Sequence, residues 1–336
     1  MQPHTTLWSE FISPENFALA LRKAAQGRKA KREIVRFFEN ADENLENLRR
    51  SVIAGEFRTS PYRTMEITDP KKRTVYILPF CPDRIVHHAL MNIIAPIWER
   101  MFIRDSYACI TGRGLHSASR RAMEFVRRNK YVLKCDIRKF YPSIDHDIML
   151  ETVKKTVPDA RLLEIFRDII YSTGGGKNLP IGNLCSQWMG NLYLHEFDIF
   201  IKRQLGVRDY VRYSDDFCLY SNDKSELKIF REKMREFLAG QLGLIFSKSE
   251  IFPVSNGVDF VGYRHFPDFI LLRKRTAKKM AARMRQIGAM RDIPPDKADR
   301  IRGQVAAAHG WLKYACSYNL RKKLRFGLLK KKVGIS

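Results

Sequence analysis

The sequence lacks the usual features of secreted, zinc-binding and membrane-embedded proteins. Its six cysteines, at positions 81, 109, 135, 185, 218 and 316, stand far apart and include no CxxC pair, which argues against a zinc site and a disulfide framework. No run reaches the roughly 18 apolar residues of a membrane-spanning helix. The N-terminus also lacks the basic and apolar segments of a secretory signal. We therefore expect a cytoplasmic protein with reduced thiols and no membrane partner.

Acidic residues are scarce relative to basic ones. The 336 residues include 61 Lys and Arg but only 36 Asp and Glu, which gives a formal net charge of +25. A surplus of this size indicates a polyanionic partner, and nucleic acid is the first candidate. Because 45% of the residues are hydrophobic, the chain can form two packed domains or one large composite domain.

The basic surplus is concentrated near the C-terminus. Residues 273–336 contain 19 Lys and Arg against 3 Asp and Glu, a net +16. Two helix-like runs, 277–287 and 297–314, flank a Pro-Pro break and keep apolar residues in helical register. A charge run alone often marks a solvated surface. The apolar register favours a small helical domain with a basic face that contacts nucleic acid.

The remaining sequence alternates between helical and strand-like patterns. We expect helices at 1–55 (with Ser13 as an N-cap), 85–102 (introduced by Asp83), 148–171, 186–204 and 226–242. We expect strands at 62–67, 74–78, 131–136, 210–214 and 217–220, and a strand pair starting at 258. This order predicts the α+β class, with helices on one face of a small sheet.

Three acidic residues stand where strands end or turn. Asp136 ends an apolar strand, and Asp215 and Asp216 form the expected tip of an aromatic-rich hairpin. Each acid alone is typical of a turn or a cap. If the strands are neighbours, the three carboxylates meet at one sheet edge and repel each other unless cations neutralise them. Oxygen ligands of this kind select Mg²⁺ or Mn²⁺, and two such ions support phosphoryl transfer, so the pattern predicts a polymerase or a nuclease.

Several motifs resemble those of reverse transcriptases. The segment 213–216 (Tyr-Ser-Asp-Asp) resembles their Tyr-x-Asp-Asp box, and 136–141 (Asp-Ile-Arg-Lys-Phe-Tyr) resembles their first catalytic motif. Four more segments follow the order of the family's fingers hairpin, helix-opening motif, lysine-bearing segment and primer grip: 71–84, 181–187, 242–248 and 260–264. The resemblance implies an RNA-directed DNA polymerase with a right-hand fold, which has fingers, a ferredoxin-like palm and a helical thumb.

The resemblance also implies limits for these parts. They are an N-terminal helical extension at 1–55, fingers at 56–130 with 160–185 contributing, a palm at 131–265 and a basic thumb at 266–336. Two Mg²⁺ ions are implied as cofactors, with Mn²⁺ as the alternative. Asp136 and Asp215 would bind both ions, the backbone carbonyl of Ile137 would be an extra ligand, and Asp216 would be the more peripheral acid.

Further residues match positions that bind the incoming nucleotide. Lys72, Arg73 and Arg63 would hold the triphosphate of the dNTP. Tyr141 would exclude a ribose 2′-hydroxyl, with a core aromatic as the alternative role. Lys248 would protonate the departing pyrophosphate, although a solvated lysine is an equal alternative.

The remaining implied roles concern the nucleic acid. Ile181 and Gln187 would shape the pocket around the template base and the nucleotide. The primer grip would comprise Phe260, Gly262 and Tyr263. The thumb would contact the primer–template duplex through Lys274, Arg275, Lys278 and Lys279.

One motif resembles a particular subgroup. Ser186-Gln187 resembles the reverse transcriptases of diversity-generating retroelements, whereas the group II intron and retron enzymes of the same superfamily typically have Ser-Pro. Ser214 departs from that subgroup, which usually has Met there. The subgroup implies a bacterial, archaeal or phage-encoded enzyme that makes error-prone cDNA from a template-repeat RNA with a small basic accessory oligomer. The alternatives are a retron or stand-alone defence reverse transcriptase and a non-catalytic RNA-binding scaffold.

Overall fold

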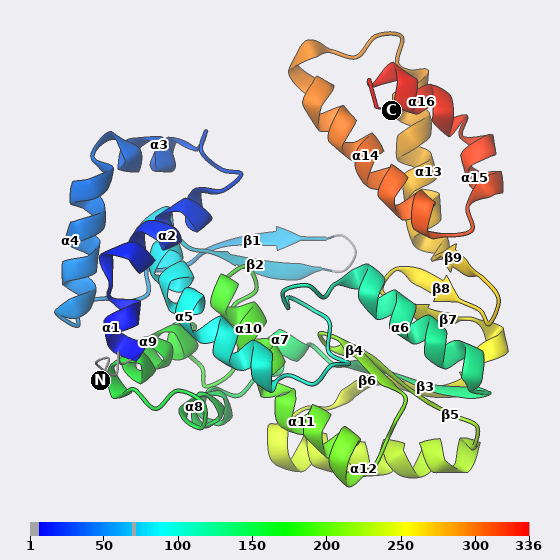
Figure 1. Ribbon diagram of the computed structural model, residues 1–336, viewed down its shortest axis with the longest axis horizontal. Coiled ribbons are helices and arrows are strands. Elements are labelled where there is room, and N and C mark those ends of the chain that lie inside the picture. The colour runs from blue at the N-terminus through cyan, green and yellow to red at the C-terminus, as the bar shows by residue number, and fades with distance from the viewer. Residues whose placement is uncertain (1–6, 69–71, 336) are drawn as a thin grey trace, which may run out of the picture. The chain divides into compact units, whose positions relative to one another are not determined.

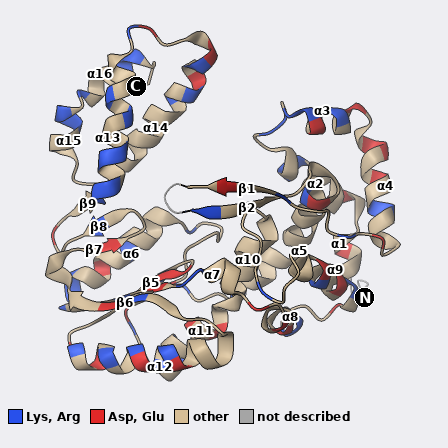
Figure 2. Ribbon diagram, turned by 180° about the vertical axis from the view of Figure 1, so that it is seen from behind, with Lys and Arg blue, Asp and Glu red and all other residues tan. Residues whose placement is uncertain are grey.

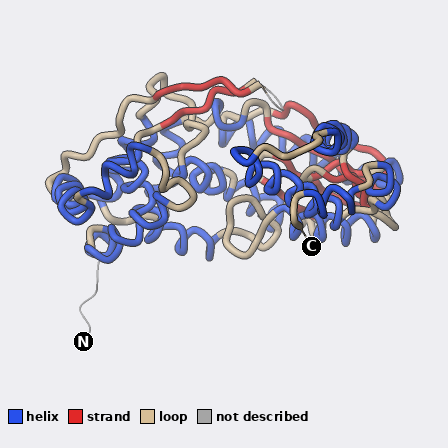
Figure 3. Tube along the Cα trace, turned by 90° about the horizontal axis from the view of Figure 1, so that it is seen from above, coloured by secondary structure: helices blue, strands red, loops and turns tan. Residues whose placement is uncertain are grey.

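The computed structural model of the protein describes residues 7–68 and 72–335. The chain forms two compact units and passes between them five times. Unit 1 comprises Met1–Arg113, Asp136–Arg208 and Glu232–Lys248, and unit 2 comprises Gly114–Cys135, Asp209–Arg231 and Ser249–Ser336. Helices predominate in the part of the chain that is described (Figure 3). The span 131–265 contributes segments to both units.

Unit 1 is mainly helical. Its described helices are α1 (Leu7–Phe11), α2 (Pro14–Ala25), α3 (Arg32–Glu39), α4 (Ala41–Ile53), α5 (Ile85–Met101), α7 (Phe140–Ser143), α8 (His146–Lys154), α9 (Ala160–Tyr171), α10 (Leu184–Tyr193) and α11 (His195–Ile199). Two π-helical turns, η1 (Phe80–Arg84) and η2 (Phe200–Gln204), and two strands, β1 (Arg63–Ile67) and β2 (Arg73–Ile77), complete its described elements.

Unit 2 combines strands and helices. Its described helices are α6 (Leu115–Arg128), α13 (Lys274–Ala289), α14 (Ala298–Tyr314), α15 (Tyr318–Lys323) and α16 (Phe326–Lys332), with short turns η3 (Val254–Asn256) and η4 (Pro295–Lys297). Its strands are β4 (Tyr210–Tyr213), β5 (Asp216–Ser221), β7 (Val258–Phe260), β8 (Tyr263–His265) and β9 (Ile270–Leu272). Three elements run from one unit into the other: β3 (Tyr131–Ile137), α12 (Lys224–Leu242) and β6 (Phe246–Pro253).

The N-terminal helices begin where the sequence places a cap. Ser13 is the N-cap of α2, and its hydroxyl accepts a hydrogen bond from the backbone N–H of Asn16 at 3.1 Å. The buried side chain of Asn16 donates to the carbonyl of Ala89 at 3.0 Å, which ties α2 to α5. The helices expected over 1–55 are confirmed for the described part, 7–53.

The hairpin β1–β2 is antiparallel, with Arg63 opposite Ile77 and Ile67 opposite Arg73. Its two expected strands are therefore confirmed, whereas residues 69–71 between them lie outside the described residues. Because opposed residues share a face and side chains alternate along a strand, Arg63 and Arg73 lie on the same face.

The helix expected over 148–171 is in fact two helices, α8 and α9. Asp159 is the N-cap of α9, and its carboxylate accepts from the backbone N–H of Arg161 at 3.0 Å. Pro158 precedes this cap, has no amide hydrogen and disfavours a helical conformation at the residue before it. The apolar periodicity continues on both sides of this break, which explains why the pattern predicted one helix.

Asp83 does not introduce the helix after the hairpin, contrary to expectation. Helix α5 begins at Ile85, after the turn η1, and Arg84 occupies its cap position. The buried carboxylate of Asp83 instead accepts from the backbone N–H of Ser60 at 2.9 Å. Burial raises the pKa of this carboxyl above its ordinary value.

A four-stranded sheet has the strand order β4-β5-β3-β6. Along the chain, β3 is followed by helices, the β4–β5 hairpin, α12 and then β6. A separate antiparallel sheet contains β7, β8 and β9. In unit 2, α6 packs against β4 and β8, and the Ser119 hydroxyl and His265 Nε2 form a buried hydrogen bond of 2.6 Å. Mixed strands and helices confirm the expected α+β character.

The β4–β5 hairpin differs from the expectation by one residue. Tyr213 pairs with Asp216, so the turn residues are Ser214 and Asp215 rather than Asp215 and Asp216. Ser214 has φ of 59°, a left-handed conformation that tight hairpin turns use and that non-glycine residues seldom adopt. Asp216 is therefore the first residue of β5, which the composition of the turn did not reveal.

The C-terminal part of unit 2 is a cluster of helices (Figure 1). Helices α13, α14 and α16 contact each other around buried apolar side chains that include Met284, Ile287, Val305, Leu312 and Phe326. The two expected runs and the break between them are confirmed, whereas α15 and α16 were not expected. Lys and Arg recur along α13 and α15 (Figure 2). None of the described helices combines the length and the apolar character that a membrane span needs.

Candidate active site

Asp136 lies near the C-terminal end of β3 and is half-buried. Its Oδ1 accepts a hydrogen bond from the Ser247 hydroxyl at 2.6 Å. Ser247 belongs to β6, which is the neighbour of β3 in the sheet. A neutral hydroxyl orients the carboxylate but does not cancel its charge. Ser247 therefore orients the Asp136 carboxylate through a hydrogen bond to a neutral group.

The turn that carries Asp215 is supported by a buried arginine. Arg212 is 0% exposed, and its Nη1 donates to the carbonyl of Ser214 at 3.1 Å. This hydrogen bond fixes the residue directly before Asp215. No motif pointed to Arg212, although an arginine within the apolar run Tyr210–Tyr213 is an available signal, because buried charges are rare unless they are paired.

The carboxylate of Asp216 forms an ion pair with the ammonium of Lys134. Both side chains are partly buried, with 27% and 17% of their surface exposed. Lys134 Nζ also lies 5.0 Å from the centroid of the Phe260 ring, within cation–π distance. Lys134 stands two residues before Asp136 in β3, so both side chains lie on the same face of the strand. No motif pointed to Lys134, although a lysine inside an apolar strand is a visible irregularity.

The strands that carry Asp136 and Asp216 are neighbours, because β3 lies beside β5 in the sheet. The strand neighbourhood on which the metal prediction depends is therefore confirmed. Across residues 7–68 and 72–335, no three His, Cys, Asp or Glu side chains lie close enough together to form a metal site by themselves. Any bound ion would need further ligands from the backbone, from water or from a substrate.

The hairpin β1–β2 is hydrogen-bonded to the loop before α10. The Tyr76 N–H donates to the carbonyl of Ile181 at 2.8 Å. The next residue, Gly182, has φ of 120°, and a Cβ there would lie 2.5 Å from the Tyr76 carbonyl oxygen. Only glycine permits this close approach. Gln187, in the first turns of α10, is exposed.

The expected triphosphate-binding cations lie on or beside this hairpin. Arg63 and Arg73 are exposed on its shared face. Lys72 is exposed as well and forms an ion pair of 2.8 Å with Glu66. Exposed pairs of this kind contribute little stability, about 0–1 kcal/mol, so Lys72 is not committed to a structural role.

A cavity of about 620 Å³ in unit 1, here called the basic pocket, lies against the same hairpin. Strand β2 contributes Val75 and Ile77 to its lining, and the loop before α10 contributes Gly182. Four cationic side chains also line it: Lys23, Arg28, Lys31 and Arg84. The lining thus combines an apolar side with a strongly basic one.

Two buried donors face this pocket without protein partners. Within the described part of the chain, Arg84 Nε and His87 Nε2 are buried and have no hydrogen-bond partner. Burial lowers the pKa of His87 to about 3 and that of His88 to about 4, and the neighbouring positive charge of Arg84 adds to both shifts. Both imidazoles are therefore neutral at pH 7. Unsatisfied buried donors beside several cations favour an anionic ligand.

Tyr141 lies at the start of α7 and is half-buried. A Cβ at Gly190 of α10 would approach the Tyr141 ring to 3.3 Å, so this glycine lets the ring lie against α10. Tyr141 is therefore not a fully buried core residue. Lys248, the neighbour of Ser247 in β6, is exposed.

The residues predicted for the primer grip belong to the sheet β7–β9. Phe260 and Tyr263 are buried and pair across β7 and β8. Between them, Gly262 has φ of 84°, and a Cβ there would lie 2.7 Å from the Trp311 ring of α14. The Tyr263 ring lies 4.9 Å from the same indole. Glycine is therefore required where α14 packs on this sheet.

The cations predicted to contact nucleic acid are all exposed on the first half of α13: Lys274, Arg275, Lys278 and Lys279. The buried side of the helix carries Ala281, Met284 and Ile287.

The sequence matches the protein family described as reverse transcriptase (RNA-dependent DNA polymerase) over residues 68–265, more than half of the chain. The chain belongs to the reverse transcriptase family. It is 25% identical to Protein YkfC of Escherichia coli K12 over 312 residues, which cover 78% of each chain.

This reverse transcriptase is also similar to two proteins with more specific names. It is 24% identical over 225 residues to the retron Ec73 reverse transcriptase of Escherichia coli, covering 61% of this chain and 68% of the relative. It is 22% identical over 173 residues to the group II intron-encoded protein LtrA of Lactococcus lactis subsp. cremoris, covering 48% of this chain and 28% of LtrA. The reverse transcriptase thus spans less than a third of LtrA. These similarities support homology to group II intron and retron-type enzymes.

As a reverse transcriptase, the protein is an RNA-directed DNA polymerase, and its family implies an RNA template and nucleotide substrates. Reverse transcriptase domains generally depend on a divalent metal, typically Mg²⁺. The donor chemistry here fits such an ion, since Asp136 and Asp216 are partly exposed carboxylates on neighbouring strands. Mg²⁺ is usually held by one or two carboxylates together with waters and substrate phosphates, which does not require a third acidic ligand.

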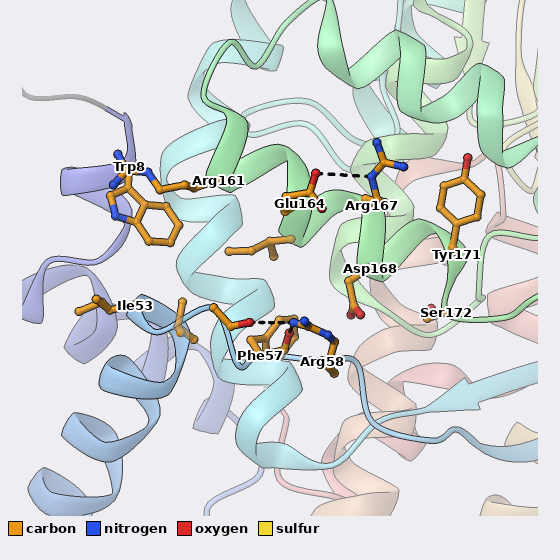
Figure 4. A pocket seen from close by; sticks show the side chains of 13 residues that line it. Trp8, Ile53, Phe57, Arg58, Arg161, Glu164, Arg167, Asp168, Tyr171 and Ser172 are labelled. Carbon is orange, nitrogen blue, oxygen red and sulfur yellow. Dashed lines mark hydrogen bonds and ion pairs between the residues drawn. The ribbon is translucent and has the colours of Figure 1, made fainter.

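A second cavity of about 630 Å³ lies in unit 1, and its lining includes none of the three acids predicted for catalysis (Figure 4). Figure 4 shows Trp8 beside Arg161, whose guanidinium lies 4.6 Å from the ring centroid. Asp168 accepts from the N–H of Thr59 at 2.6 Å, and Arg58 donates to the carbonyl of Phe57 at 2.6 Å. These polar groups already have partners within the protein. The cavity is lined by the N-terminal helices and α9, and its polar groups connect these elements structurally.

Proposed function

We propose that this reverse transcriptase extends a DNA primer by two-metal-ion nucleotidyl transfer, with Asp136, Asp215 and Asp216 as its catalytic carboxylates. The observation that supports this most directly is the sheet order, which makes the strand of Asp136 a neighbour of the strand that begins at Asp216. The intact acidic set argues against a non-catalytic scaffold, because uncompensated carboxylates cost stability.

The acids have different roles in this proposal. Asp136 and Asp215 hold both ions, and the carbonyl of Ile137 is an extra ligand. Asp216 is the more peripheral acid, and its ion pair with Lys134 supports this role. When bound there, Mg²⁺ or Mn²⁺ would supply activation of the primer hydroxyl and stabilisation of the leaving oxygen.

The incoming dNTP is bound by the hairpin β1–β2 and the base of the palm. Arg63, Lys72 and Arg73 hold the triphosphate, whose negative charge grows during transfer. Tyr141 excludes the ribose 2′-hydroxyl, and its half-buried ring supports this role more than a core role. Lys248, exposed on β6, protonates the departing pyrophosphate.

The RNA template enters through the basic pocket. Its cations and unsatisfied donors suit backbone phosphates, and its apolar side suits bases. Ile181 and Gln187 shape the templating position, which the hydrogen bond between Tyr76 and Ile181 supports by fixing the loop to the hairpin.

The primer–template duplex contacts the sheet β7–β9 and the C-terminal helices. Phe260, Gly262 and Tyr263 form the primer grip. The exposed cations of α13 bind backbone phosphates. In this assignment 131–265 is the palm, and its strand order β6-β3-β5-β4 is the order of a split βαβ, ferredoxin-like sheet. The fingers are 56–130 with part of 160–185, and the thumb is 266–336.

Two sources of template RNA are compatible with this chemistry. The similarity to retron and group II intron proteins favours an RNA of that kind. Ser186-Gln187 favours a diversity-generating retroelement, with a template-repeat RNA and a small basic accessory oligomer. Sequencing the RNA that copurifies with the protein distinguishes them, since near-identical repeats that differ at adenines identify the retroelement.

The proposed mechanism is tested by Asp215→Asn in primer extension on an RNA template. We expect the rate of dNTP incorporation to fall about 10³-fold or more, because the carboxylate charge is lost while the side-chain size is kept. RNA binding and thermal stability should stay close to those of the unsubstituted protein. Asp268→Asn, at an exposed acid of unit 2, is the matched control and should keep full activity. Undiminished incorporation by Asp215→Asn would refute the assignment.

A further inference from the structure

Lys134 lies at the proposed metal site although its positive charge opposes metal binding, and no motif assigned it a role. Its ammonium contacts the Asp216 carboxylate, and only 17% of its side chain is exposed. It lies on the same face of β3 as Asp136, two residues away. A lysine is therefore held where the proposed function brings in divalent cations.

The surroundings of Lys134 give its ammonium a second favourable contact. Nζ lies 5.0 Å from the centroid of the buried Phe260 ring. The Lys134 ammonium contacts both a carboxylate and an aromatic face. If the carboxylate moves away, the ring still stabilises the ammonium through the cation–π interaction. The ring is also part of the sheet β7–β9 that is proposed to contact the primer.

We propose that Lys134 is an internal counter-ion that occupies Asp216 in the metal-free enzyme and competes with divalent metal for this carboxylate. This proposal rests on the proposed function, in which Asp216 belongs to the metal site. When metal binds, the contact between ammonium and carboxylate is exchanged for a contact between metal and carboxylate. The lysine stays protonated and remains against Phe260. Lys134 thereby acts as a positioning residue that keeps Asp216 aimed at the site before the metal arrives.

The competing explanation is a permanent structural ion pair. In that case Lys134 stabilises the protein equally with and without metal, and its removal does not tighten metal binding. The exchange proposal predicts the opposite on both counts. A positive charge beside the metal repels it and withholds one ligand, since Coulomb interactions at a few ångströms are strong in partly buried sites.

The experiment measures metal binding and stability in the full-length protein with Lys134→Met. Binding of Mn²⁺ alone, followed by electron paramagnetic resonance, should tighten about 3- to 10-fold. Without divalent metal, the melting temperature should fall below that of the unsubstituted protein by several degrees. In saturating Mg²⁺ this deficit should shrink by at least half. Lys134→Arg, which keeps the charge, should restore the original Mn²⁺ affinity.

The matched control is Lys130→Met, which removes an exposed lysine directly before the same strand. It should change neither the Mn²⁺ affinity nor the dependence of stability on Mg²⁺. Should Lys134→Met fail to fold, Lys134→Gln provides the same two measurements, with an amide in place of the ammonium.

Unchanged or weaker Mn²⁺ binding by the Lys134 variant would overturn the proposal. An equal loss of stability with and without Mg²⁺ would do the same. Neither readout depends on polymerisation. A failure of the proposed function appears separately, as absence of dNTP incorporation by the unsubstituted protein or as full activity of Asp215→Asn.

Discussion

Gly182 lies where the loop before α10 meets the hairpin β1–β2, and its replacement with alanine tests this contact. The glycine has φ of 120°, and an added Cβ would lie 2.5 Å from the Tyr76 carbonyl oxygen. Alanine in a left-handed conformation costs about 1 kcal/mol. Moving the loop away from Tyr76 also breaks the hydrogen bond from Tyr76 N–H to Ile181, which is worth about 1 kcal/mol. We therefore expect Gly182→Ala to lower the free energy of unfolding by about 2–3 kcal/mol.

Gly174→Ala is the matched control for this substitution. Gly174 has φ of 67°, but a Cβ there meets no atom within 4 Å. Gly174→Ala therefore costs only the backbone strain of a left-handed alanine, about 1 kcal/mol of unfolding free energy. Urea unfolding of both variants measures the difference, which should be about 1–2 kcal/mol.

The same substitution should also affect the dNTP. The displaced loop lies against the hairpin that carries Arg63 and Arg73, so the KM for dNTP should rise about 10-fold, as a cost near 1.4 kcal/mol implies. Steady-state primer extension measures this, and Gly174→Ala should leave KM unchanged. Equal unfolding free energies and equal KM values for the two variants would refute the reasoning.

Three further outcomes are expected. Tyr141→Ala should let ribonucleotides compete with deoxyribonucleotides in primer extension, and unchanged sugar discrimination would return Tyr141 to a packing role. Replacing Lys274, Arg275, Lys278 and Lys279 of α13 with glutamine should reduce the slope of log Kd against log salt by about 3–4 in duplex binding, and an unchanged slope would place the phosphate contacts elsewhere. Burial lowers the pKa of His265 from its ordinary value of 6.5 to about 4 in the folded protein. Below pH 6.5 the unfolded chain therefore binds a proton at His265 more readily than the folded protein does. Stability should therefore fall by about 2 kcal/mol between pH 7 and pH 5 on account of this residue. His265→Gln should flatten that decline in thermal unfolding, and a decline as steep as before would exclude the residue as its source.

The sequence predicted the strand and helix content well where local signals are strong. The cap at Ser13, the strands at 63–67 and 73–77 and the break at Pro294-Pro295 follow from side-chain chemistry that acts within a few residues. The merged helix over 148–171 shows the limit of periodicity, which does not register a break when apolar residues continue on both sides.

Motif and strand pattern both predict the acids of the candidate site, and the sheet order agrees with the strand neighbourhood that this prediction requires. The residues that support these acids were not predicted. Lys134 pairs with Asp216, which is distant in sequence, and Arg212 bonds to the Ser214 carbonyl, whose position depends on the turn. The hairpin turn at Ser214 was missed by one residue for a similar reason. The pairing of Tyr213 with Asp216 imposes the left-handed backbone of Ser214, and a serine in the sequence does not indicate such a conformation.

The chain passes back and forth between the two units, which determines the order in which the parts of each unit are synthesised. Unit 1 is completed only by residues 232–248, after two segments of unit 2 have already been synthesised. During translation, its last part therefore leaves the ribosome late, and neither unit corresponds to one continuous gene fragment. A nonsense mutation before residue 232 would leave both halves unfinished at once, so functional truncations of this enzyme are confined to its ends.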